Sequence, residues 1–113
     1  MIEYAELFID AVDEGLGVLG QAPRRMIYEL LENDYEILRE DLSEKFLEFS
    51  GILKKAFGPS ADSIIQYIIN RFYVKLRLEP PAWVDLDEAV ETVEMILRTQ
   101  TEVNRESDLI LLR

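Results

Sequence analysis

Carboxylates are the most abundant groups in this sequence that could do chemistry. The chain has 113 residues, of which 23 are Asp or Glu, and Glu29-x-x-Glu32 places two carboxylates on one face of a helix. All-helical nucleotide hydrolases hold Mg²⁺ with one Glu-x-x-Glu pair and a Glu-x-x-Asp pair on a facing helix, because carboxylates suit this hard cation. The second pair is absent downstream. A carboxylate-only Mg²⁺ hydrolase therefore stays an alternative, and it requires four acids from two helices to converge.

Other catalytic and metal chemistries are excluded by composition, because the chain contains no His and no Cys. Nucleophiles activated by histidine, imidazole or thiolate metal sites, disulfides and redox dithiols all need one of these residues. Di-iron carboxylate bundles need Glu-x-x-His on two helices. We therefore expect no cofactor and no enzymatic activity.

A second candidate site is the turn Gly58-Pro59-Ser60, which precedes a helix and follows Lys54 and Lys55. Free amide groups at the start of that helix could hold an anion. The simpler interpretation is a glycine that ends one helix and a proline that begins the next.

Charge argues against nucleic acid and membranes as partners. The net charge is −11, and residues 1–20, 21–58, 59–78 and 79–113 carry −5, −2, +2 and −6. Phosphodiesters and anionic lipids are bound by clustered Lys and Arg. Apolar runs reach about four residues, against the roughly 20 that span a bilayer. The first residues are acidic where a signal peptide is basic, so we expect a cytoplasmic protein.

Apolar residues at alternating spacings of three and four predict that helices dominate the chain. The first stripe, over residues 2–19, consists of Ile2, Ala5, Ile9, Val12, Leu16 and Leu19. Gly15 and Gly17 each disfavour this helix by about 1 kcal/mol relative to Ala. They mark either a frayed end or a close approach of another chain segment.

Two further helices follow, each with a recognisable start. Pro23 suits the first turn of the second helix, whose stripe is Ile27, Leu30, Leu31 and Tyr35. The run from Asp41 to Glu44 fits a capping box for the third helix. That helix presents Phe46, Phe49, Leu53, Ala56 and Phe57, and Gly58-Pro59 ends it.

The fourth helix, about residues 59–78, is apolar nearly all round and is therefore predicted to be central. Pro80-Pro81 then breaks the chain, and the run from Asp85 to Glu88 caps a fifth helix over about residues 86–105, or to Ile110 if the tail is helical. We predict an all-α, single-domain, five-helix bundle. Residues 1–78 form its core, 79–85 a proline-rich break, and 86–113 a C-terminal helix and apolar tail, with helix 5 outside or shared in a dimer.

Several turn and packing motifs resemble a known family. They are Gly15-Leu-Gly-Val-Leu-Gly20, Pro23-Arg-Arg-Met-Ile-Tyr-Glu-Leu-Leu-Glu32, and Phe46, Leu53 and Ala56-Phe-Gly-Pro-Ser-Ala61. Over about residues 8–78 the chain resembles a small all-helical archaeal domain family described as a signal-output domain. Members are often attached to sensory or receiver modules. The resemblance implies a helical fold and an archaeal signalling role, and it implies no catalytic residue.

The candidate interaction residues are Trp83, in the proline-rich break, and the apolar tail, which comprises Leu109, Ile110, Leu111 and Leu112. Polar residues are usual at a chain end, and four exposed apolar side chains form a patch typical of an interface. Either the tail caps its own core or it packs against another subunit, since homo-oligomers are mostly two-fold.

The sequence thus predicts a non-enzymatic protein–protein interaction or signal-output module, with an unidentified protein partner and a homodimeric state. A small-molecule-binding domain is an alternative. It would show as a buried void lined by Phe46, Phe49, Ile68 and Phe72.

Overall fold

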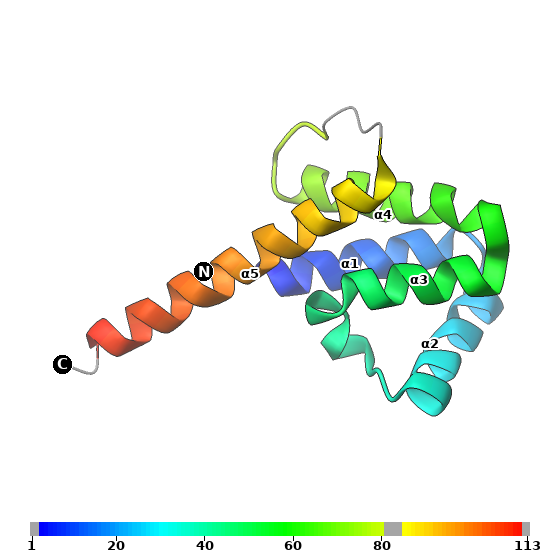
Figure 1. Ribbon diagram of the computed structural model, residues 1–113, viewed down its shortest axis with the longest axis horizontal. Helices are drawn as coiled ribbons and strands as arrows, with labels where there is room; N and C mark the ends of the chain where they lie inside the picture. The colour runs from blue at the N-terminus through cyan, green and yellow to red at the C-terminus, as the bar shows by residue number, and fades with distance from the viewer. Residues whose placement is uncertain (1–2, 81–84, 112–113) are drawn as a thin grey trace.

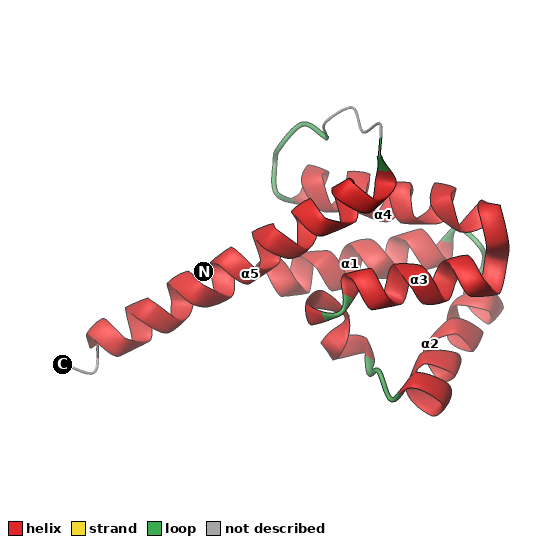
Figure 2. Ribbon diagram, viewed as in Figure 1, coloured by secondary structure: helices red, strands yellow, loops and turns green. Residues whose placement is uncertain are grey.

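The computed structural model describes residues 3–80 and 85–111, and every regular element within these ranges is helical (Figures 1 and 2). In chain order they are α1 (Tyr4–Gly17), α2 (Gln21–Tyr35), the 3₁₀ turn η1 (Arg39–Glu44), α3 (Phe46–Phe57), the 3₁₀ turn η2 (Gly58–Ser60), α4 (Ala61–Lys75) and α5 (Leu86–Leu111). The predicted all-α, five-helix bundle is confirmed.

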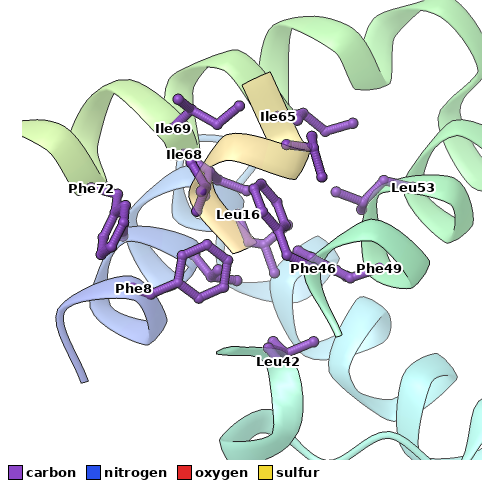
Figure 3. Packing of buried hydrophobic residues seen from close by; sticks show 14 of the residues in the cluster. Phe8, Leu16, Leu42, Phe46, Phe49, Leu53, Ile65, Ile68, Ile69 and Phe72 are labelled. Carbon is purple, nitrogen blue, oxygen red and sulfur yellow. The ribbon is translucent and has the colours of Figure 1, made fainter. Parts of the chain in front are cut away.

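Helix α4 lies at the centre of the packing, as predicted. It packs most extensively against α1 and also contacts α3 and α5. Figure 3 shows the side chains that fill the space between these helices, with the ring of Phe8 between those of Phe46 and Phe72. The Phe8 ring meets Phe46 and Phe72 edge-on, with centroids 4.7 and 5.6 Å apart, a favoured aromatic geometry.

One face of α4 is nevertheless exposed, which corrects the expectation of burial all round. Tyr67 is 42% exposed and Val74 is 47% exposed. The helix also ends earlier than predicted, at Lys75, because Arg77 adopts a left-handed conformation with φ 62°. The chain turns away from the helix axis there. Helices α1, α3 and α5 pack against α4, and the face that carries Tyr67 and Val74 is exposed to solvent.

The buried face of α1 is rotated from the predicted stripe. Phe8 and Ala11 are fully buried beside Val12 and Leu16, whereas Ile9 is only partly buried. Aromatic packing against α3 and α4 determines this rotation, because Phe8 contributes more apolar surface than Ile9.

Gly15 lies where α1 approaches α4 too closely to leave room for a side chain. A Cβ atom placed on it would collide with Cγ1 of Ile68, whereas one on Gly17 would have only Arg24 at 4.0 Å. Close approach therefore explains Gly15, and the helix end explains Gly17. At the edge of the same contact, Glu14 accepts hydrogen bonds from Arg71 and Lys75, both at 2.8 Å.

The predicted capping box at residues 41–44 does not begin α3. Instead, the Asp41 carboxylate accepts the Leu38 amide at 3.2 Å and so supports η1. Helix α3 begins at Phe46 without a side-chain cap from its own segment. The cap predicted for the fifth helix is confirmed, since Asp85 accepts the amides of Asp87 and Glu88 at 3.0 and 3.5 Å.

Helix α5 runs antiparallel to α3 and is anchored to the bundle at several points. Near its start Asp87 pairs with Lys54 at 2.9 Å. Further along, Glu94 accepts the amide of Leu47 in the first turn of α3 at 2.7 Å, and Gln100 accepts the amide of Tyr4, the first residue of α1. Helix α5 thus supplies the N-terminal caps that α1 and α3 lack.

Beyond Gln100 the backbone of α5 continues to Leu111 and projects from the body of the molecule (Figure 1). These 11 residues extend the helix by roughly 16 Å at 1.5 Å per residue. The radius of gyration is 14.7 Å, above the roughly 13 Å expected for a compact domain of this length. Among the described residues, no helix is both long enough and apolar enough to cross a membrane.

Candidate functional site

The predicted interaction residues lie at and beyond the limits of the described structure. Trp83 and Leu112 lie outside the described residues, as do the side chains of Leu109, Ile110 and Leu111. The backbone of those three residues forms the last turn of α5. The helix therefore carries the backbone of Leu109, Ile110 and Leu111 to the end of the projection, away from α1–α4 (Figure 1).

An apolar groove of about 600 Å³ lies between α2 and the C-terminal end of α3. Its lining consists of Pro23, Met26, Ile27, Glu29, Leu30, Asn33, Asp34, Ala56 and Phe57. Met26 is 67% exposed, Leu30 and Phe57 are partly buried, and Ile27 forms the buried floor. Sites that bind ligands or peptides are commonly lined in this way, by apolar side chains with a few polar groups at the edge.

The groove exists because α2 leaves the bundle at an angle (Figure 1). Helix α2 packs mainly on α1, and only Ile27 and Leu31 among its 15 residues are buried. The neighbouring stripe of Pro23, Met26 and Leu30 is left facing the end of α3.

The groove was not predicted, although the sequence carries a signal for it. Met26 lies next to the predicted stripe of Ile27, Leu30 and Leu31, so the apolar face of this helix is wider than its own contacts need.

A charged pocket of about 420 Å³ lies on another side of α2, next to α1 and η1. At its centre the Asp13 carboxylate accepts hydrogen bonds from the hydroxyl of Tyr28 and from the guanidinium of Arg39, including Arg39 Nε at 3.1 Å. This network joins α1, α2 and η1.

Electrostatics in this pocket favour a fixed ion pair. Burial raises the pKa of Asp13, but hydrogen bonds from Arg39 and Tyr28, with the nearby charges of Arg39 and Arg24, lower it more, so the pKa lies below its ordinary value. Burial and the bond to Asp13 raise the pKa of Tyr28 far above its usual range. Both groups keep one protonation state near neutral pH, so the network positions helices rather than transferring protons.

The pair Glu29-x-x-Glu32, singled out as a candidate Mg²⁺ ligand, lines the same pocket. Its neighbours there include Arg24, Arg25 and Arg39. In residues 3–80 and the described part of α5, no three acids come together in an arrangement that could hold a metal ion.

The turn at Gly58-Pro59-Ser60 leads directly into α4 as η2. The amide of Ala61 donates to the carbonyls of Gly58 and Pro59 within this turn, and Lys54 pairs with Asp87. The carboxylate of Asp87 raises the pKa of Lys54. One of the two lysines proposed to attract an anion is therefore already paired.

The residues that would line a small-molecule void fill the core instead. Phe46, Phe49, Ile68 and Phe72 are fully buried, and the first and last of these pack on Phe8 (Figure 3).

Comparisons with protein-family models, with curated proteins and with solved structures find no match to this chain.

Proposed function

We propose that this chain is a non-enzymatic protein–protein interaction module that acts as a homodimer through its C-terminal helix. The observation that carries the proposal is the projection of α5 beyond Gln100, with the apolar tail at its end. The resemblance to an archaeal signal-output family implies a signalling role, which is consistent with a module that acts by protein–protein contact.

A projecting helix of this kind gains stability from a partner. An isolated helical segment of 11 residues is marginal in water. Successive positions of a helix lie about 100° apart, so Leu109, Ile110 and Leu111 do not share one helix face. A second polypeptide that surrounds the end of α5 would remove this surface from water.

The proposal is tested by measuring the mass of the full chain in solution. Sedimentation velocity should give a dimer for the native sequence. A full-length variant with Leu109, Ile110, Leu111 and Leu112 all changed to Gln should sediment as a monomer, since Gln keeps helix propensity and removes the apolar surface. Circular dichroism serves as the control that the bundle is intact. Equal masses for the two proteins, whether monomer or dimer, would refute the proposed role of the tail.

A further inference from the structure

We propose that the groove between α2 and α3 is the receptor for the apolar tail of a second copy, so that two chains exchange tails in a reciprocal dimer. This inference rests on the proposed function and names the surface through which it acts. The groove is large, apolar and open, with Met26 at its edge and Ile27 at its floor.

The tail cannot reach the groove of its own chain. The groove lies at the C-terminal end of α3, where Ala56 and Phe57 line it. Helix α5 begins near that end, where Asp87 pairs with Lys54, and it runs antiparallel to α3 towards the opposite end. The 24 residue-to-residue steps from Asp87 to Leu111 place the helix end roughly 36 Å further along this axis.

Opposite placement of tail and groove suits a closed two-fold assembly. When two elongated molecules lie side by side and antiparallel, the tail end of each is beside the groove end of the other. A two-fold axis then makes both contacts equivalent and leaves no unpaired tail or groove. The whole molecule measures 49 × 34 × 21 Å, so it is long enough in one direction for this arrangement to keep the two contacts apart.

The chemistry of the two surfaces matches a helix bound in a groove. Helices recognised in this way present apolar anchors at spacings of three, four and seven residues. Val103 and Ile110 are seven residues apart in the sequence, and Leu111 follows Ile110 directly. The rim carries Glu29 and Asp34. Arg105 and Arg113 lie on either side of the apolar run, although Glu106 and Asp108 also occur there, so apolar contact contributes more than charge.

A pair of matched methionine variants tests the groove. Met26 is 67% exposed on α2 inside the groove, and Met95 is 66% exposed on α5 outside it. Met26→Glu should weaken dimerisation by at least tenfold in its dissociation constant, because a carboxylate would then be buried against an apolar tail. Met95→Glu should leave the constant unchanged. Both changes lie on exposed helix faces, and circular dichroism verifies that each variant folds.

Mixing two defective full-length variants tests the exchange itself. Met26→Glu keeps its tail and lacks a working groove, whereas the four-Gln tail variant keeps its groove. Each alone should be monomeric, and native mass spectrometry of the mixture should show heterodimers joined by one intact contact. Absence of heterodimers would overturn the exchange. If Met26→Glu stays dimeric while the tail variant is monomeric, the tail binds elsewhere, so this inference fails and the proposed function stands. A monomeric native chain would refute both.

Discussion

At the scale of single residues, Gly15 allows a close contact between α1 and Ile68 of α4. Gly15→Ala should lower the free energy of unfolding by about 1–3 kcal/mol, because the new methyl group overlaps Ile68 in a packed core. Gly51, inside α3, has no atom within 4 Å of an added Cβ. Gly51→Ala should therefore stabilise the protein by up to about 1 kcal/mol through helix propensity. Guanidinium denaturation of both variants makes the comparison.

A double-mutant cycle identifies the cause of the Gly15→Ala effect. Ile68→Ala removes the colliding Cγ1 atom and should by itself cost about 2–5 kcal/mol. The double variant should lose less free energy of unfolding than the sum of the losses in the two single variants, because the new methyl group occupies space that the isoleucine side chain leaves. Additive costs would place the strain elsewhere in α1.

The Asp13 network makes part of the stability depend on pH. The folded-state pKa of Asp13 lies below its ordinary value of 3.8, so its ionised form stabilises the fold at pH above this value, and the benefit is lost as pH falls through the folded pKa. Asp13→Asn should lower the free energy of unfolding by about 1 kcal/mol near neutral pH, where the partly exposed ion pair is intact. The difference from the native protein should vanish in acid. A constant difference across the pH range would contradict an electrostatic origin.

At the scale of elements, α5 supplies caps to two other helices. Glu94→Ala should cost about 1 kcal/mol, typical of a lost N-terminal cap, because the Leu47 amide loses its acceptor. Glu94→Gln should recover much of this, since its amide oxygen can accept the same bond. Glu91→Ala, at an exposed position on the same helix, is the control and should change stability little. Thermal unfolding of the three variants measures the order of their stabilities.

Local patterns predicted the helices well because apolar spacing, proline and glycine act over a few residues. The start of α5 at Asp85 is such a case. The start of α3 was missed because its cap comes from Glu94, 47 residues away from Leu47 in sequence. The rotation of α1 towards Phe8 was also missed, since it depends on where the rings of Phe46 and Phe72 lie. Long-range contacts of this kind have no signature within one element.

The parts of the candidate site also differ in whether a local sequence pattern marks them. The apolar tail is conspicuous in the sequence because it has four consecutive large apolar residues, and its role as an interaction site stays a prediction. The sequence did not identify the groove, because the exposure of Met26 follows from the angle at which α2 leaves α1. The available signal in the sequence was Met26, an apolar residue next to the predicted stripe of Ile27, Leu30 and Leu31.

At the scale of the whole molecule, the net charge of −11 opposes the approach of two copies. Salt screens this repulsion within a Debye length of about 10 Å at 0.1 M, while apolar contacts persist. The dissociation constant of the proposed dimer should therefore fall severalfold between about 0.05 and 0.5 M NaCl. Sedimentation equilibrium at these salt concentrations provides the measurement. Weaker association at high salt would indicate an interface held mainly by ion pairs.

Helix α5 connects its far end to the bundle through Glu94 and Gln100, which hold the first turns of α3 and α1. Helix α5 therefore couples its projecting end to the stability of the bundle. Binding of a partner to the end of α5 would stabilise the helical form of α5 and, through these hydrogen bonds, the folded bundle. A folded bundle would strengthen partner binding by the same coupling free energy. The melting temperature of the native chain should then rise with protein concentration, whereas that of the four-Gln tail variant should stay constant. Dilution alone would loosen the bundle, so the amount of protein present would set how firmly each copy is folded.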